Sequence, residues 1–200
     1  MSFFKKYSYT VVKLIVNQFA ISILGNVLAI ACGMAKNYTL MLVTSIFAVL
    51  FYVFLNYSAL WEIGYKEIPS IATGRLARRP LAGLYMSLLA AIPNFLLAVL
   101  VTLGNLLSDI KFFSTLGGIT AMVAIWLEGM YTGILSFIKI GGHAANSYWI
   151  SCFIIIIPGL IAGWLGYYFG IRNFHLTRIL IAETPEEAEK KRVEKEKHNK

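Results

Sequence analysis

Five long apolar stretches occupy most of the 200-residue chain and decide the solvent in which it folds. Each is close to or longer than the about 20 residues that an α-helix needs to cross the hydrocarbon core of a bilayer. Lipid offers no partner to an unpaired backbone group, so continuous apolar segments of this length must be helical. A transmembrane barrel would instead show strands of about ten alternating residues. The stretches cover residues 9–33, 39–61, 81–107, 112–138 and 148–170.

Composition agrees with a membrane protein. Hydrophobic residues make up 58% of the chain and charged residues only 14%, whereas about a quarter of the residues in a soluble domain are charged. The net charge of +8 does not indicate nucleic-acid binding, because the basic residues flank apolar helices. There they act as orientation signals and contact anionic headgroups. We therefore expect an all-α polytopic membrane protein whose partner is the lipid bilayer with its anionic headgroups, and no nucleic acid.

The distribution of lysine and arginine predicts the topology. If all five stretches cross the membrane from a cytoplasmic N-terminus, eight of the 18 basic residues lie inside and ten outside. If the fourth stretch enters and leaves on the same side, 15 lie inside and three outside, which the positive-inside rule prefers. The sequence thus predicts a plasma-membrane protein with four full transmembrane helices, a re-entrant or partial helical segment near 112–138, and both termini in the cytoplasm. Five transmembrane helices remain the alternative.

The fourth stretch differs from the others in composition. It contains the pair Gly117-Gly118 near its start, Glu128 at its centre, and Gly129 and Gly133 after an apolar half. Two half-helices broken around Gly129 would form a re-entrant hairpin, which is tolerated only where protein or a water-filled cavity surrounds the break. The other interpretation is an ordinary tilted crossing with one buried glutamate.

Two polar residues within apolar stretches form the candidate intramembrane polar site. Glu128 is an ionisable group at membrane depth, which by default suggests ion or proton handling. A protonated or boundary-placed glutamate beside the Gly129 break is the alternative. Asn94 follows Pro93, which removes a backbone donor and predicts a bend, and its amide could satisfy a carbonyl freed there. Pro158 predicts a second bend in the last stretch.

Small residues at helical spacing predict close helix packing. They lie in the first and last apolar stretches, and either a dimer interface or packing within the monomer would use them. The candidate helix-packing residues are Gly25, Ala29, Gly33, Gly159, Gly163, Gly166 and Gly170.

Charged residues cluster in the connection over 62–80. They could bind a phosphate, a lipid headgroup or another subunit, or simply mark a cytoplasmic loop that sets orientation. The candidate headgroup or partner contacts are Glu62, Lys66, Glu67, Arg75, Arg78 and Arg79.

The start of this connection carries a family resemblance. Its pattern Trp61-Glu62-x-Gly64-x-Lys66-Glu67, followed by Gly74-Arg75, resembles one in small multi-pass membrane proteins of Gram-positive bacteria. The resemblance covers about a tenth of the chain. It implies a bacterial plasma membrane, and since that family has no assigned activity it implies no functional residues.

Motifs for catalysis and metal binding are absent from the sequence. The chain has no Gly-x-Ser-x-Gly elbow, no His-Glu-x-x-His and no Walker lysine loop. Cys32 and Cys152 have no cysteine or histidine at metal spacing, so we expect no catalytic residue, metal or cofactor.

Beyond the helical transmembrane domain, 1–170, the charged tail over 171–200 is expected to be cytoplasmic, as a short helix or disordered.

These features lead to three functional hypotheses. The first is a non-enzymatic accessory or oligomeric subunit of a transport or envelope complex, docking through its glycine faces and the basic loop to a second copy or a partner membrane subunit. The second is a small oligomeric transporter or channel that uses Glu128. An intramembrane enzyme is a distant third.

Overall fold

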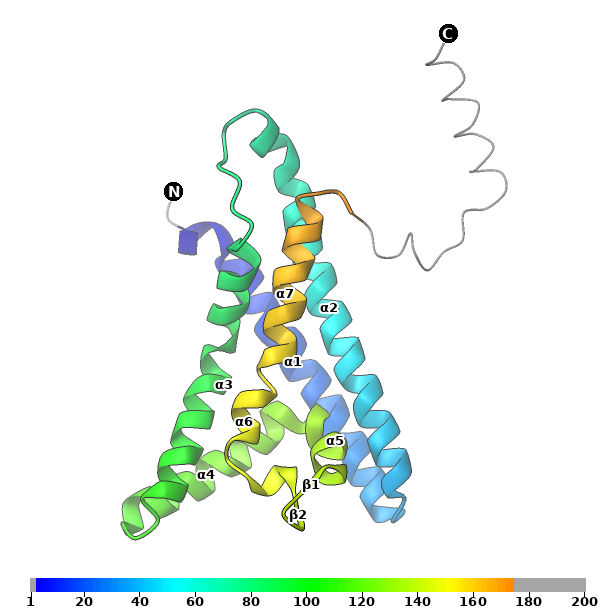
Figure 1. Ribbon diagram of the computed structural model, residues 1–200, viewed down its shortest axis with the longest axis vertical. Coiled ribbons are helices and arrows are strands. Elements are labelled where there is room, and N and C mark those ends of the chain that lie inside the picture. Colours follow the sequence, from blue (N-terminus) through cyan, green and yellow to red (C-terminus); the bar gives the residue numbers. More distant parts are fainter. Residues whose placement is uncertain (1–2, 175–200) are drawn as a thin grey trace, which may run out of the picture.

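The computed structural model describes residues 3–174, and these are almost entirely helical (Figure 1). Five helical segments are long and apolar enough to cross a membrane, which confirms the all-α polytopic fold. The elements in chain order are α1 (Phe3–Met34), α2 (Tyr38–Ala72), α3 (Ala82–Leu106), α4 (Lys111–Glu128), the 3₁₀ turn η1 (Gly129–Tyr131), α5 (Thr132–Phe137), β1 (Lys139–Ile140), β2 (His143–Ala144), the 3₁₀ turn η2 (Ala145–Ser147), α6 (Ser151–Ile154) and α7 (Ile157–Gly170).

Four helical segments run between the two ends of the molecule, and the fourth consists of α6 and α7 in succession (Figure 1). We call one end the basic end; it holds the start of α1, the α2–α3 connection and the end of α7. The other is the hairpin end; it holds the α1–α2 turn, the α3–α4 turn and the β1–β2 pair. Helices α1 and α3 lead from the basic end to the hairpin end, and α2 and the α6–α7 segment return. The start of the chain and the end of α7 therefore lie at the same end.

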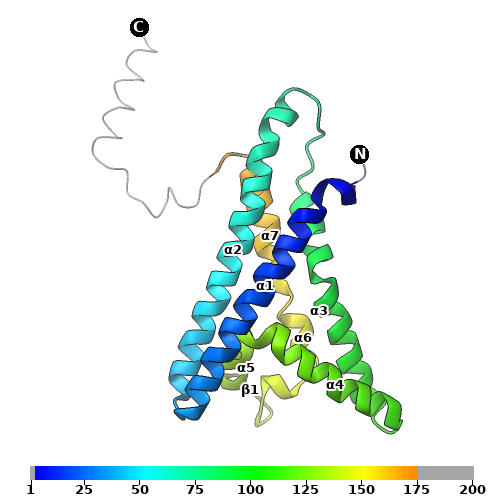
Figure 2. The same cartoon turned by 180° about the vertical axis from the view of Figure 1, so that it is seen from behind.

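The fourth apolar segment does not run through the molecule. Helix α4 rises from the hairpin end into the bundle, η1 reverses the chain, and α5 returns to the hairpin end, as both views show (Figures 1 and 2). By length alone the segment Lys111–Phe137 could span a membrane. Its reversal at Gly129 instead gives four full helices plus a re-entrant segment, as the charge distribution and the glycine break predict.

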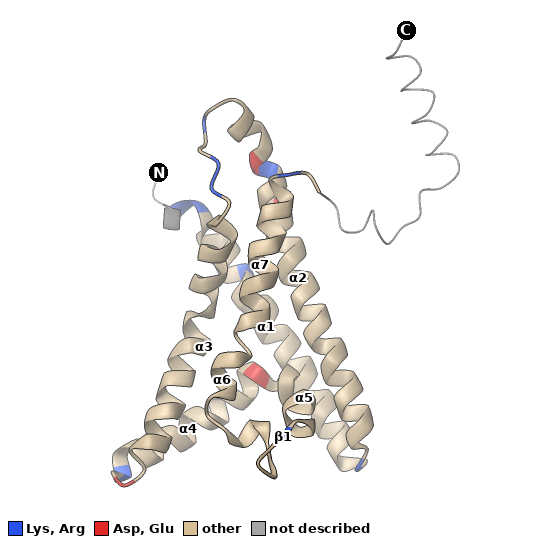
Figure 3. Cartoon of the chain, in the orientation of Figure 1, with Lys and Arg blue, Asp and Glu red and all other residues tan. Residues whose placement is uncertain are grey.

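Most of the charged residues lie toward the two ends of the molecule (Figure 3). Within residues 3–174, only three basic residues belong to elements at the hairpin end: Lys36, Lys111 and Lys139. Lys66, the α2–α3 connection and Arg172 place the larger share at the basic end. The tail over 175–200, for which a short helix or disorder was expected, lies outside the described residues.

Helix α2 is longer than its apolar stretch. At about 1.5 Å per residue its 35 residues extend about 52 Å, well beyond the about 30 Å of a hydrocarbon core. The connection expected over 62–80 therefore starts only after Ala72, and Glu62, Lys66 and Glu67 are helical. The expectation that they belong to a loop was wrong, because hydropathy marks where lipid ends and not where backbone hydrogen bonding ends.

The two prolines in the apolar stretches act differently. Pro93 lies inside α3, whereas Pro158 lies in the first turn of α7, where its missing N–H breaks no hydrogen bond. The last apolar stretch is accordingly divided into α6 and α7.

At the α1–α2 turn, Lys36 adopts a left-handed φ of 52°, and Asn37 caps α2 by accepting a hydrogen bond from Leu40 N at 3.0 Å.

Glycines in α7 bring its backbone against α2 and α3. An added Cβ at Gly166 would clash with Tyr57 O, and one at Gly170 with Trp61 O. Gly159 and Gly163 lie equally close to side chains of those helices. These four glycines therefore pack α7 against α2 and α3 within the monomer.

The glycine face of α1 divides into two parts. An added Cβ at Gly25 would lie 2.5 Å from Met130 Cα, so this residue packs on the re-entrant hairpin. Ala29 is half-buried. Gly33 is exposed, and none of the described atoms lies within 4 Å of the position of its added Cβ.

Candidate intramembrane polar site

A row of polar side chains on α1 supports the inner end of the hairpin. Gln18, Ser22 and Asn26 are spaced four residues apart, so they share one face of the helix. Ser22 Oγ donates to Leu127 O at 2.5 Å and Gln18 Nε2 to the same oxygen at 3.4 Å. Asn26 Nδ2 donates to two successive carbonyls beginning at Ile125, at 3.1 and 3.2 Å. A helix end leaves carbonyls unpaired, and lipid cannot satisfy them, so this row makes the break possible.

Helix α2 holds the other side of the hairpin. Ser45 Oγ donates to Met130 O at 2.5 Å and accepts from Ile134 N at 3.3 Å, so one hydroxyl binds both the 3₁₀ turn and α5. An added Cβ at Gly133 would clash with Met41 O. The hairpin is therefore clasped between α1 and α2 by hydrogen bonds and by close backbone contact.

Glu128 is the last residue of α4 and lies inside the bundle. It is 8% exposed, and its Oε1 has no hydrogen-bond partner among the described residues. A buried polar atom without a partner costs free energy, and an unpaired buried charge costs more. This carboxyl therefore needs a proton, a water molecule or a cation to complete its environment.

Glu128 lines a cavity of about 350 Å³ at the hairpin end. Helices α3, α4 and α5 and the segment from η2 to α6 form its walls. Asn105, Asn146 and Ser147 line it and are exposed, whereas Glu128 is buried, so the cavity deepens toward the carboxyl group. Thr132 and Ser151 add further polar groups to its wall.

Asn94 lines a second, smaller cavity inside the bundle. Its volume of about 20 Å³ is enough for roughly one water molecule. Asn56 Oδ1 and Ser87 Oγ, which also face it, have no hydrogen-bond partner within residues 3–174. Gln18 lines this cavity and also donates to Leu127 O, next to Glu128. The structure thus places Asn94 and Glu128 in separate cavities, and Gln18 connects the smaller one to the backbone next to Glu128.

A third polar cluster lies toward the basic end and is centred on Glu67. Its carboxylate accepts from the Tyr7 hydroxyl at 2.6 Å and from the Tyr167 hydroxyl at 2.5 Å. Lys6 Nζ lies 2.6 Å from Oε1. Glu67 is only 6% exposed. It is therefore engaged inside the bundle and does not present its carboxylate to a headgroup or a partner.

The other charged residues of the expected 62–80 cluster remain on the surface. Lys66 Nζ pairs with Glu62 Oε1 at 2.5 Å across one helical turn. Arg75, Arg78 and Arg79 are exposed and form no ion pair with any residue between 3 and 174. The three arginines are thus the members of the cluster that stay open to a headgroup.

Sequence reasoning did not identify the α1 row or the tyrosines that bind Glu67. The four-residue spacing of Gln18, Ser22 and Asn26 within an apolar helix was a visible signal for the row. No comparable signal marked Tyr7 and Tyr167, because their common partner lies on a third helix. Among the described residues no three His, Cys, Asp or Glu side chains are grouped to hold a metal ion, and both cysteines are free.

No family model matches the sequence, and neither a curated protein nor a solved structure matches the chain. The functional assignment therefore depends on the chemistry of the described residues. The likeness of the 61–75 segment to small multi-pass membrane proteins of Gram-positive bacteria remains an expectation.

Proposed function

We propose that the protein is a small transporter or channel that moves protons or small cations across a bacterial plasma membrane, with Glu128 as the group that binds them. One observation carries this proposal: a buried carboxyl group with an unpartnered oxygen lies at the inner end of a cavity, at the tip of a re-entrant hairpin. Ionisable residues within membrane segments typically face such cavities and mark ion or proton pathways.

The geometry around Glu128 favours a cation or a proton over an anion. Broken helices in transporters often supply backbone carbonyls to coordinate cations. Here Ser22 and Asn26 already occupy carbonyls at the end of α4, which leaves the Glu128 carboxylate as the available ligand. The C-terminal end of α4 also carries the negative end of the helix dipole, which adds to the attraction for positive charge.

Further polar groups extend from the cavity toward the basic end. The water-sized cavity beside Gln18 and Asn94 comes next, and the Glu67 cluster lies beyond it. A water in the small cavity would satisfy Asn56 and Ser87 and shorten the distance over which a proton must pass. The Glu67 cluster packs three helices together, so passage to that end requires these helices to separate.

The competing role as a docking subunit has less support. It depends on glycine faces that are open to a partner, yet Gly25 and the α7 glycines already pack within the monomer.

The positive-inside rule assigns the basic end to the cytoplasm, which makes the Glu128 cavity open to the outside.

Ion flux into vesicles that contain the purified protein tests the proposal. The variants are Glu128→Gln and, as the matched control, Glu62→Gln, whose carboxylate is exposed and paired with Lys66. A dye sensitive to pH reports proton entry, and separate Na⁺ and K⁺ gradients report cation entry. We expect wild-type vesicles to dissipate at least one gradient, Glu128→Gln to slow this roughly tenfold or more, and Glu62→Gln to leave it unchanged.

Two results would contradict the proposal. One is wild-type flux no faster than in protein-free vesicles for all three cations. The other is full activity of Glu128→Gln in a sample that elutes from a sizing column as the wild type does.

A further inference from the structure

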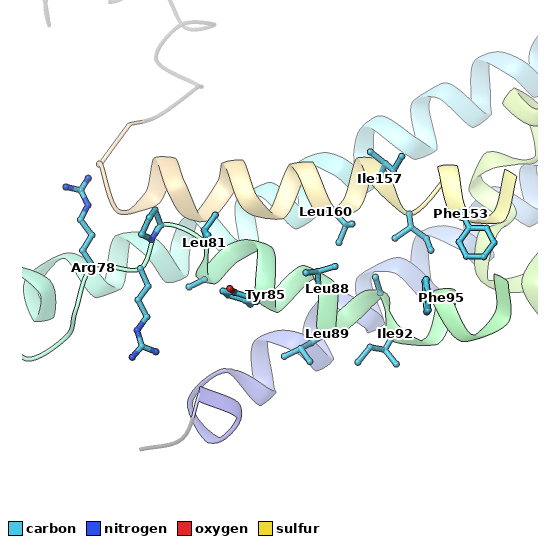
Figure 4. Close-up of a pocket in the computed structure, with 15 residues that line it drawn as sticks. Arg78, Leu81, Tyr85, Leu88, Leu89, Ile92, Phe95, Phe153, Ile157 and Leu160 are labelled. Atoms are coloured by element: carbon cyan, nitrogen blue, oxygen red, sulfur yellow. The ribbon is translucent and has the colours of Figure 1, made fainter. Parts of the chain in front are cut away.

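An apolar groove of about 1160 Å³ runs along the outside of α3 and α7 (Figure 4). It begins at Arg78, Arg79 and Pro80 at the basic end. From there Leu88 and Ile92 of α3 face Ile157 and Leu160 of α7 across it (Figure 4). Its volume exceeds the about 300–1,000 Å³ of ordinary small-molecule pockets.

The groove has a defined length and a closed far end. From Leu81 to Phe95 it follows 15 residues of the α3 segment, whose ends lie about 21 Å apart at 1.5 Å per residue. This is more than half of an about 30 Å hydrocarbon core. At the far end Phe95 and Phe153 meet edge to face, with ring centroids 5.8 Å apart. The groove therefore suits an elongated apolar chain that enters from one leaflet.

The two arginines at its open end have unsatisfied charges. Arg78 and Arg79 are exposed and pair with no carboxylate within residues 3–174. Three other cations of the basic end are engaged: Lys6 pairs with Glu67, Lys66 with Glu62, and Arg172 stacks on the ring of Tyr168 at 4.2 Å. Arg75 forms no ion pair within residues 3–174 either, but it does not line the groove. Guanidinium groups bind phosphate oxygens in a planar, bidentate geometry, so two of them beside an apolar groove match a phosphate with an attached acyl chain.

We propose that this groove is a binding site for one anionic phospholipid. Its phosphate contacts Arg78 and Arg79, and an acyl chain lies between α3 and α7 as far as Phe95 and Phe153. The charge at one end and the apolar lining along the rest match the two parts of such a lipid. The groove and the Glu128 cavity have no lining residue in common, so the proposal stands independently of ion transport.

Native mass spectrometry of the purified protein tests this site. The protein is reconstituted into vesicles of phosphatidylethanolamine and phosphatidylglycerol and extracted in mild detergent. The mass of the extracted complex then shows which lipid the protein retains. The double variant Arg78→Gln/Arg79→Gln is compared with Arg75→Gln, which removes a charge from the same connection but does not line the groove. We expect the wild type and Arg75→Gln to retain one phosphatidylglycerol molecule. In the double variant, the fraction of protein that retains this lipid should fall roughly tenfold or more.

A groove-filling variant separates a bound lipid from loosely attracted lipid. Ile157→Trp places a large ring in the groove without changing charge, and we expect it to abolish lipid retention. Three results would overturn the proposal: no phosphatidylglycerol retained by the wild type, an equal loss in Arg75→Gln, or full retention by Ile157→Trp. A lipid-free dimer that Ile157→Trp dissociates would also overturn it, because a second copy of the chain would then fill the groove.

Discussion

At the scale of single residues, Glu67 shows how a membrane protein tolerates a buried carboxylate. Two tyrosine hydroxyls and one lysine surround it, each from a helix other than its own. Hydrogen bonds to an ionised acceptor are roughly twice as strong as neutral ones, and together they offset the desolvation of the charge. The cluster joins α1, α2 and α7 at the level where the bundle meets the basic end.

Replacing Tyr167 with phenylalanine tests the contribution of this cluster. Tyr167 is 1% exposed and donates to Glu67 Oε2, so the variant leaves a buried carboxylate oxygen with one donor fewer. We expect the free energy of unfolding in detergent micelles to fall by about 1.5–3 kcal/mol. Tyr9→Phe is the control, because Tyr9 is 80% exposed and should change stability little. Equal stability of the two variants would mean that the hydrogen bond contributes nothing measurable.

Residue patterns in the sequence predicted only part of these contacts. Glu128 stood out because a charge in an apolar stretch is rare, and it lines a cavity as an isolated intramembrane acid should. Glu67 was assigned to a loop because it follows the end of an apolar stretch, yet α2 continues and turns this side chain inward. Its tyrosine partners lie 60 and 100 residues away, and no local pattern encodes such a pairing.

At the scale of elements, the re-entrant hairpin depends on α1 as much as on its own sequence. The glycine break at Gly129 predicts where α4 stops, whereas the partners of its terminal carbonyls depend on which helix passes nearby. That helix is α1, with Ser22 and Asn26 facing the break. Gly25 lets the two backbones approach on the adjoining part of the same helix.

Paired glycine substitutions in α1 test this contact. In Gly25→Ala the added methyl would lie 2.5 Å from the backbone of Met130, so the hairpin must shift, and we expect a loss of about 1–3 kcal/mol in unfolding free energy. Gly33→Ala meets open space in the described structure and should stabilise the helix by about 0.5–1 kcal/mol. Chemical unfolding of both variants in the same detergent provides the measurement. A loss in Gly33→Ala as large as in Gly25→Ala would point instead to a partner helix on that face.

At the scale of the whole molecule, the fourth apolar segment sets the number of crossings. Counting hydropathy alone gives five candidate spans, because Lys111–Phe137 is long and apolar enough. The distribution of lysine and arginine favours four. The number of basic residues on each side of the membrane depends on where every connection lies, so one extra crossing changes the count. The folded chain follows the charge distribution: both ends of this segment lie at the hairpin end (Figures 1 and 2).

Labelling of single cysteines with a membrane-impermeant maleimide tests this topology and its orientation. Three variants, Arg75→Cys, Asp109→Cys and His143→Cys, are made in a chain whose Cys32 and Cys152 are replaced by alanine. Asp109 and His143 lie on either side of the re-entrant segment and Arg75 lies at the opposite end of the molecule.

Because the basic end should face the cytoplasm, we expect Asp109→Cys and His143→Cys to react in intact cells and Arg75→Cys only after permeabilisation. Reversal of all three would invert the orientation and keep the hairpin. Labelling of Asp109→Cys and His143→Cys from opposite faces would show a full fifth crossing. Glu128 would then lie within a continuous span, and the cavity that opens at the hairpin end would no longer explain how ions reach it.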